Sequence, residues 1–146
     1  MSIRMRRAET DRLALSGGDS ILVKRYLTAG EYRDMVKSSH KPVTIPLGAT
    51  LQTVPRVEFD SDASGQAQVL AYLLDWTFQD ADGRPIVIAD QPAAVVAAAL
   101  RAIDADAYME VQNAIQRHAD AIDTALKAEK KMAAATAPDK TLSSVG

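Results

Sequence analysis

The C-terminal third of the chain carries a long stripe of apolar residues that recur every three or four positions. An α-helix turns once every 3.6 residues, so this spacing places the side chains on one face of a helix. We therefore predict a long amphipathic helix over about residues 105–131, beginning at Asp104 or Asp106 and buried along this stripe. The stripe consists of Tyr108, Val111, Ile115, Ala119, Ile122 and Leu126.

The N-terminal part contains two β-prone runs, residues 12–15 and 20–27, separated by Gly17 and Gly18. Glycine adopts the positive φ angles that tight turns need, so the two runs predict a β-hairpin. A helix over about residues 29–38 should follow the hairpin directly.

The start of that helix has the signature of a capping box. Thr28 and Glu31 stand three residues apart, so that each side chain can accept a hydrogen bond from a backbone N–H of the first turn. The face of the helix that is expected to point to the core carries Tyr32, Met35 and Val36.

The middle of the chain is expected to change from extended to helical. Residues 40–57 contain Pro42, Pro46 and Pro55, and proline lacks the N–H that a central strand or a helix interior uses. We predict an extended crossing there, with one short edge strand at most, packed along the domain. A helix over about residues 62–76 should follow, because apolar residues again recur at helical spacing.

The segment after this helix is rich in turn-forming residues. Asp82-Gly83 predicts a turn, and residues 84–88 predict a short extended piece. Asp90 is expected to cap the next helix, with Pro92 near its first position, where the missing N–H costs nothing. This helix should run to about Ile103.

The 146 residues are enough for one hydrophobic core and short for two, so we expect a single domain over residues 11–131. The order of elements predicts the α+β class: an N-terminal β-hairpin with a short helix, then a mainly α-helical part ending in the long amphipathic helix. Residues 1–10 lack periodicity and are expected to form a flexible arm. Residues 132–146 have low complexity and little to bury, which predicts a disordered tail.

The charge balance and the absence of cysteine exclude several classes of protein. With 17 Lys and Arg residues against 19 Asp and Glu residues, the chain has no overall field to hold a nucleic-acid backbone. No run of about 18 apolar residues occurs, so no membrane span is expected, and the same charge balance disfavours an anionic membrane surface as a partner. Without cysteine there is no disulfide and no cysteine-based zinc site.

No catalytic, cofactor-binding or metal-binding constellation stands out in the sequence. The two histidines, His40 and His118, have no spacing that suggests a shared ligand. Asp75, Asp80 and Asp82 offer the oxygen ligands that hard cations prefer, but a turn explains them better. We therefore expect a protein that is not an enzyme, uses no cofactor and binds other polypeptides. A small metal-dependent enzyme that uses these aspartates is the less favoured alternative.

The single tryptophan lies in a series of motifs whose order is more informative than any one of them. The series comprises Asp75-Trp76-Thr77-Phe78, Asp82-Gly83-Arg84-Pro85-Ile86, the cap at Asp90, and a helix with Tyr108-Met109-Glu110-Val111-Gln112-Asn113-Ala114-Ile115. In the front half, a strand-like run, Ile21-Leu22-Val23-Lys24-Arg25-Tyr26-Leu27, leads into Thr28-Ala29-Gly30-Glu31. Over residues 11–130 this order resembles the tail assembly chaperones of long-tailed, siphovirus-type bacteriophages and related prophages.

The resemblance implies a function in virion assembly. A tail assembly chaperone binds the tape measure protein and helps to recruit subunits of the tail tube protein in the host bacterial cytoplasm. It is not retained in the virion. Self-association of the chain is left open, and the alternative among interaction proteins is a virion structural component or a head–tail joining protein.

A chaperone of this kind needs an apolar surface that covers its client and free ends for a second partner. The candidate client-binding residues lie on the last two predicted helices and are Val95, Val96, Leu100, Ile115 and Ile122. The alternative is that these residues close the domain's own core. The N-terminal arm and the C-terminal tail are the candidates for the second partner.

Overall fold

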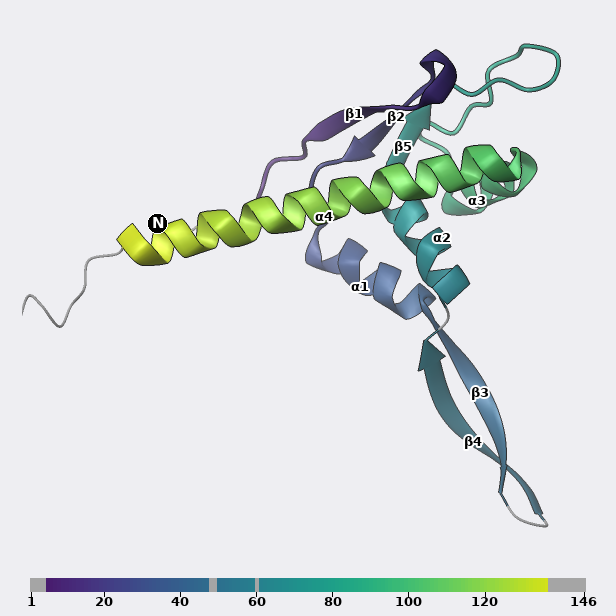
Figure 1. Cartoon of the computed structure of the whole chain (residues 1–146). Helices are drawn as coiled ribbons and strands as arrows, with labels where there is room; N and C mark the ends of the chain where they lie inside the picture. Colours follow the sequence, from purple (N-terminus) through teal and green to yellow (C-terminus); the bar gives the residue numbers. More distant parts are fainter. Residues whose placement is uncertain (1–4, 48–49, 60, 137–146) are drawn as a thin grey trace, which may run out of the picture.

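The computed structural model describes residues 5–47, 50–59 and 61–136, with side chains described for residues 5–39 and 62–134. The chain has the predicted α+β architecture, with α4 crossing a three-stranded antiparallel sheet of order β1-β2-β5 (Figure 1). Its elements are, in chain order, β1 (Thr10–Ala14), η1 (Ser16–Gly18), β2 (Ser20–Lys24), α1 (Ala29–Ser38), β3 (His40–Leu47), β4 (Thr50–Phe59), α2 (Ser61–Tyr72), β5 (Leu73–Trp76), α3 (Ala93–Ala102) and α4 (Ala105–Thr136).

The N-terminal hairpin forms as the sequence predicts, with β1 antiparallel to β2. The turn is a short 3-10 helix in which Gly17 and Gly18 have φ angles of 67° and 80°, values that residues with a side chain rarely adopt. Ser16 ties this turn to α4, because its backbone N–H and its hydroxyl donate hydrogen bonds to the Glu110 carboxylate at 3.2 and 3.0 Å.

The predicted helix over residues 62–76 is wrong in its last turn, which is a strand. α2 ends at Tyr72, and β5 then pairs with β2, with Trp76 opposite Ile21. The register shifts within this pairing, and the irregularity lets Leu73 and Trp76, three residues apart, both enter the core. A spacing of three therefore fits an irregular strand as well as a helix.

The segment between α1 and α2 is a second hairpin, whereas the sequence predicted an extended crossing with one short edge strand at most. β3 and β4 pair with each other as a separate two-stranded antiparallel sheet. The prolines fit there because each strand of a two-stranded sheet has a free edge, where a missing N–H breaks no ladder hydrogen bond. The predicted packing of residues 40–57 along the domain lies outside the described side chains.

α1 forms with the predicted capping box but does not bury the face that was assigned to the core. The Thr28 hydroxyl accepts a hydrogen bond from the Glu31 N–H at 3.2 Å, and the Glu31 carboxylate accepts one from the Thr28 N–H at 2.9 Å. Met35 is half-buried, but Tyr32 is 58% exposed and Val36 37%. The predicted core face is wrong because α1 packs on α2, outside the buried cluster that joins the sheet to α4.

Replacing Thr28 with alanine is expected to lower the free energy of unfolding by about 1 kcal/mol, because the Glu31 N–H loses its partner. Urea denaturation followed by circular dichroism measures the change. Ser38, exposed at the other end of α1, is the matched control, and Ser38→Ala should change the value by less than about 0.5 kcal/mol. Equal losses in the two variants would contradict a contribution from the cap.

α3 does not begin at the predicted cap. Pro92 is its N-cap residue, and no side chain caps the helix. Asp90 instead has a φ of 58°, in the left-handed region that aspartate tolerates in turns, so it belongs to the turn that precedes the helix. The end of α3, with Ile103 as the C-cap residue, agrees with the sequence.

α4 begins directly after Asp104, as predicted, and continues beyond the expected end at residue 131 to Thr136. The first residues of the predicted tail are therefore helical, and residues 137–146 lie outside the described chain. Within the part that the structure describes, no helix is both long and apolar enough to cross a bilayer.

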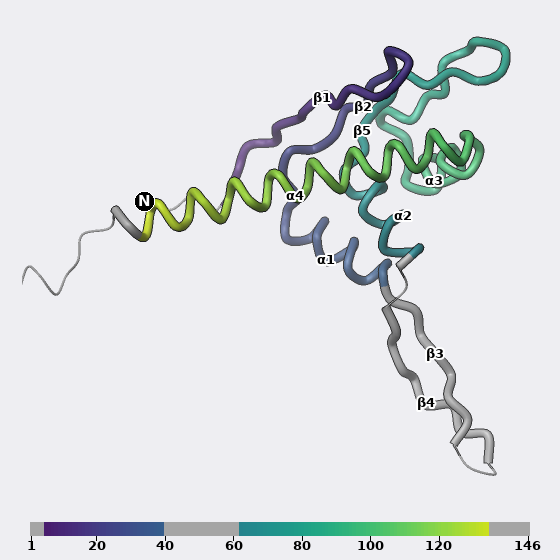
Figure 2. The backbone as a smooth tube through the Cα atoms, in the orientation of Figure 1, coloured from purple at the N-terminus to yellow at the C-terminus, as the bar shows by residue number. Residues whose placement is uncertain are grey.

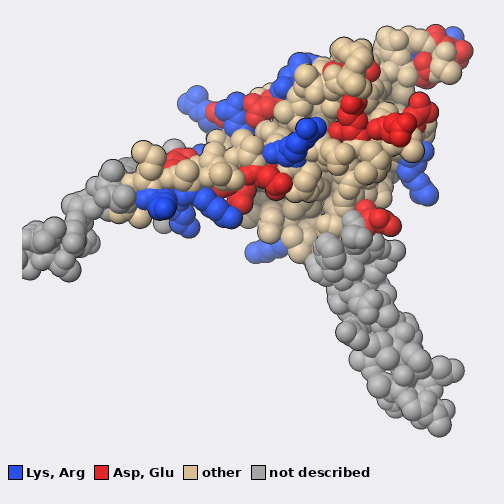
Figure 3. Space-filling model, in the orientation of Figure 1, with Lys and Arg blue, Asp and Glu red and all other residues tan. Residues whose placement is uncertain are grey.

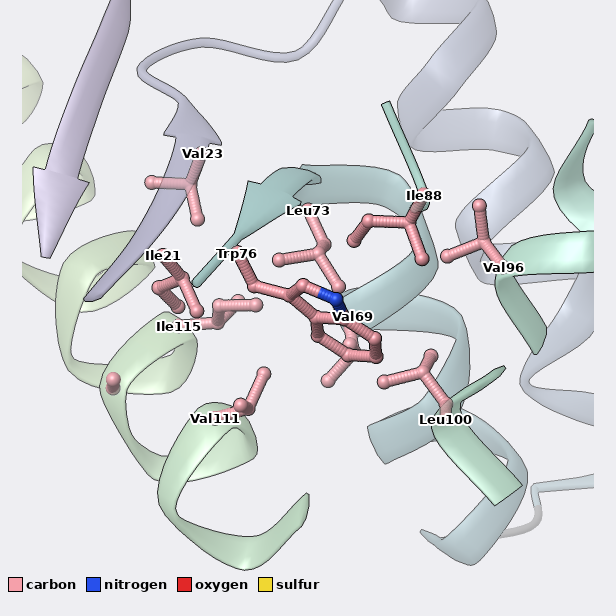
Figure 4. Close-up of a cluster of buried hydrophobic side chains, with 11 residues drawn as sticks. Ile21, Val23, Val69, Leu73, Trp76, Ile88, Val96, Leu100, Val111 and Ile115 are labelled. Carbon is pink, nitrogen blue, oxygen red and sulfur yellow. The ribbon is translucent and has the colours of Figure 1, made fainter. Parts of the chain in front are cut away.

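The core lies where α2, α3 and α4 meet the sheet. Figure 4 shows the Trp76 indole among aliphatic side chains from all of these elements. The predicted stripe on α4 is confirmed at its centre, where Val111 and Ile115 are fully buried. The buried cluster consists of Ile21, Val23, Val69, Leu73, Trp76, Ile88, Val96, Leu100, Val111, Ala114 and Ile115.

Candidate functional site

The segment around Trp76 joins the sheet to α3 through a tight turn. The indole Nε1 donates a hydrogen bond to the Ile86 carbonyl oxygen at 2.8 Å, and the residue is 6% exposed. The Ile86 N–H donates to the Phe78 carbonyl oxygen at 3.0 Å, so the chain folds back on itself. The Phe78 ring packs on the indole, with 5.0 Å between the centroids. The polar and apolar parts of Trp76 are thus both used within the chain.

Two aspartates of this segment, Asp75 and Asp80, accept hydrogen bonds from backbone N–H groups. Asp80 Oδ1 accepts hydrogen bonds from the N–H groups of Asp82 and Arg84, at 2.9 and 3.0 Å, as expected for a turn residue. Asp75 Oδ1 accepts one from the Trp76 N–H at 2.8 Å. Across the described ranges, no three His, Cys, Asp or Glu side chains lie close enough together to hold a metal ion.

His118 is a buried residue of α4 that contacts the sheet. Its Nε2 donates a hydrogen bond to the Lys24 carbonyl oxygen at 3.0 Å, because a carbonyl can only accept. The same nitrogen lies 3.9 Å from Asp11 Oδ2, and the ring meets that of Tyr72 edge-on at 5.9 Å. Through these contacts His118 connects α4 to the N-terminal hairpin. The other histidine, His40, lies outside the described side chains.

Asp11 and Arg25 form a bidentate ion pair beside His118. Arg25 Nη2 donates to Asp11 Oδ1 at 2.6 Å, and Arg25 Nε donates to Oδ2 at 3.0 Å. The hydrogen bonds from Arg25 hold the pKa of the Asp11 carboxyl below its ordinary value, and they outweigh the opposing effect of burial. Arg25 Nη1 also reaches Glu9, at 2.7 Å, so this arginine ties the segment before β1 to the end of β2.

Asp11 is expected to stabilise the fold less as the pH falls. Its pKa is lower in the folded chain than in the unfolded chain, where it is about 3.9. The contribution is therefore complete above that value and is lost as the pH falls through the folded pKa. Urea midpoints of the wild type and of Asp11→Asn should differ at neutral pH, begin to approach each other near pH 4 and converge only below the folded pKa. Asp82→Asn, in an exposed turn, is the control; a difference for Asp11→Asn that grew toward low pH would contradict the expectation.

The predicted client-binding residues divide between the core and the surface. Val96, Leu100 and Ile115 belong to the buried cluster of Figure 4, so the chain's own core uses them. Val95 is 43% exposed on α3, and Ile122 is half-buried on α4. Of the five, Val95 and Ile122 remain accessible to a partner.

A groove of about 290 Å³ lies between α1 and α2. α1 lines it with Asp34, Met35 and Ser38, and α2 lines it with Leu70 and Ala71, among others. The walls of this groove are mostly apolar. The small side chains of Ala67 and Ala71 on α2 leave room for an incoming group. The groove is therefore suited to apolar side chains of a partner.

A second cavity, of about 720 Å³, lies between the segment before β1 and the chain that leaves β2. Arg6 and Arg7 line one side, and Leu27 is among the apolar residues. In Figure 2 the N-terminal segment runs beside the C-terminal end of α4. Arg6 holds it there, with its guanidinium 4.7 Å from the centre of the Tyr26 ring and 3.9 Å from Glu129.

Lys24 and Glu31 line both cavities, so their ion pair lies between the two. Burial acts to raise the pKa of Glu31, but hydrogen bonds from Lys24 and Thr28 outweigh it and lower that pKa. Glu31 is therefore ionised and paired at neutral pH. We refer to the two cavities, with this ion pair between them, as the double groove.

The double groove could not be predicted from the sequence because its walls come from segments that are far apart in the chain. The segment before β1, the exit from β2, α1 and α2 all contribute to it. The apolar residues of α1 give a local signal, but their spacing alone predicts a core face. Local spacing shows that a helix has an apolar face and does not show what covers that face.

Lysines and arginines are interspersed with aspartates and glutamates over the face shown in Figure 3, without one dominant sign.

Comparison with protein-family models, with curated proteins and with solved structures finds no match to this chain. The double groove and the motifs around Trp76 are therefore the features that bear on function.

Proposed function

We propose that this chain is a tail assembly chaperone of a long-tailed bacteriophage or prophage. It binds the tape measure protein and helps to recruit tail tube subunits in the host bacterial cytoplasm, without a cofactor and without being retained in the virion. The order of motifs around Trp76, which resembles that family, supports the proposal. The alternative is a virion structural or head–tail joining protein.

The observation that carries the proposal is the partly exposed apolar surface of α1 beside its groove with α2. Tyr32 and Val36 are exposed on α1, while Met35 and Leu70 line the groove beside them. Exposed apolar surface of this kind is typical of proteins that bind another chain.

Co-expression of the chain with the tape measure protein tests this proposal. A soluble complex of the two proteins is expected, and the doubly substituted variant Tyr32→Ser/Val36→Ser should reduce its yield severalfold. Val87→Ser, which changes an exposed valine far from α1, is the matched control and should leave the yield unchanged. A client that stays insoluble or unbound beside the wild-type chain counts against the proposal.

Mass spectrometry of purified virions separates the chaperone from the structural alternative. A chaperone should be absent when the tail tube protein, the internal standard, is readily detected. A head–tail joining protein or another structural component should instead appear in a fixed ratio to that standard. Recovery of this chain in such a ratio would replace the chaperone proposal with the structural one.

A further inference from the structure

The second half of α4 continues past the hydrophobic core. Ile115 is the last residue of α4 in the buried cluster, and none of the side chains from Ala119 to Ala134, which we call the distal segment, is buried. In Figure 1 this part of the helix runs past β1, away from α3. Most of the stability of a helix in a protein comes from packing of its apolar face, and the distal segment has little of that packing within its own chain.

The distal segment nevertheless has an apolar face. Ile122 and Leu126 are half-buried, Ala125 is exposed and Met132 is 68% exposed. Helical periodicity places these four side chains within about a third of the circumference of the helix. A face of this width on a projecting helix is suited to packing against a second helix.

The charges of the distal segment follow an order along the helix. Asp120 and Asp123 come first, and Lys127, Lys130 and Lys131 come after them. The helix dipole favours lysines near the end of α4, but its effect is confined to the terminal turns and does not explain aspartates in the middle of the helix. Asp123 pairs with Lys127 at 2.9 Å, whereas Lys130 and Lys131 make no ion pair with a described side chain.

We propose that the distal segments of two copies of this chain pair as antiparallel helices. In this direction the aspartates of each copy lie opposite the lysines of the other, whereas parallel pairing would bring like charges together. Both parts of the complementary pattern are present in one segment, so a second copy satisfies it without any other partner. The pairing is two-fold symmetric, and every contact therefore occurs twice.

One register satisfies the apolar face and the charges together. Ala125 of one copy then lies beside Met132 of the other, with Ile122 between the two helices. The same register brings Asp123 of one copy beside Lys130 of the other, at the edge of the contact, where an ion pair keeps most of its hydration. This pairing does not depend on the proposed function, because it needs no client.

Sedimentation equilibrium of the full chain over about a hundredfold range of concentration tests the proposal, because the population of a dimer rises with concentration. The wild type should dimerise, and a wild type that stays monomeric over the whole range would overturn the proposal. Two double variants reverse the charges: Asp120→Lys/Asp123→Lys and Lys130→Asp/Lys131→Asp. Each should raise the dissociation constant by about tenfold or more, since it turns attraction into repulsion at both ends of the contact.

A mixture of the two double variants should recover the dimer. In a mixed dimer lysines face aspartates at both ends, so the dissociation constant should return to within about twofold of the wild type. The matched control is Arg33→Asp/Lys37→Asp, which makes the same change in net charge as the lysine variant at exposed positions of α1. It should leave the dissociation constant unchanged, and a loss equal to that of the lysine variant would count against the proposal. All substituted positions are exposed, so every variant should keep the circular dichroism of the wild type.

Disulfide cross-linking determines the direction of the pairing. The chain has no cysteine, so a disulfide can form only between introduced ones. Ala125→Cys mixed with Met132→Cys should give a covalent dimer on oxidation. Either variant alone should give little, because identical positions of antiparallel helices lie too far apart here for a disulfide. Parallel pairing would place identical positions side by side and link each variant to itself. That result, or the absence of a mixed product, would overturn the antiparallel arrangement.

Discussion

Replacing Trp76 with alanine is expected to lower the free energy of unfolding by about 3–5 kcal/mol. The indole is 6% exposed at the centre of the buried cluster, and its removal leaves a cavity among side chains from the sheet and three helices. The substitution also removes the hydrogen bond from Nε1 to the Ile86 carbonyl oxygen. Domains of this size are stable by about 5–15 kcal/mol, so this loss is a large share of the total stability.

Urea denaturation followed by circular dichroism measures this loss without depending on tryptophan fluorescence. Trp76→Phe keeps much of the ring but not the donor, so it should lose less stability than Trp76→Ala. Val87→Ala, at a position that is 63% exposed in the same segment, should change the value by less than about 0.5 kcal/mol. A loss below about 1 kcal/mol for Trp76→Ala would mean that the indole does not hold the core together as described.

Replacing Ile115 with alanine is expected to cost about 2–5 kcal/mol of stability, because its side chain is fully buried where α4 meets the sheet. This residue was also a candidate for binding a client. Its placement in the core predicts that Ile115→Ala weakens client binding only through loss of folded protein. Urea midpoints, measured beside client affinity at a temperature where the variant is folded, separate the two effects.

Val95→Ala is the matched control for this pair of measurements. Val95 is 43% exposed on α3, so its truncation should change the free energy of unfolding by less than about 0.5 kcal/mol. An Ile115→Ala variant that kept full stability but lost client affinity would reverse the assignment of Ile115 to the core.

The parts of the fold that could be predicted from the sequence depend on neighbouring residues. Three such features each depend on a short stretch of chain and form as expected. They are the capping box of Thr28 and Glu31, the turn at Gly17 and Gly18, and the stripe of α4. The α+β class follows from the order of such elements.

The parts that could not be predicted depend on distant residues. Leu73 to Trp76 form a strand because β2 offers them an edge to pair with, and helical spacing in the sequence does not reveal that edge. Ile115 and Ile122 belong to the same stripe, yet only the first is fully buried, since burial depends on which elements α4 crosses. The double groove is missed for the same reason, because its walls come together only in the folded chain.

The position of β2 in the middle of the sheet has a consequence for the rate of folding. β1 meets β2 through a tight turn, but β5 reaches the other edge of β2 only after α1, the β3–β4 hairpin and α2 have been traversed. Closing so long a loop is slow when the intervening chain is unstructured. Pairing of β3 with β4 brings the end of α1 near the start of α2 and so shortens the path that remains to be closed. We therefore expect the β3–β4 hairpin, which forms a separate sheet, to accelerate completion of the three-stranded sheet.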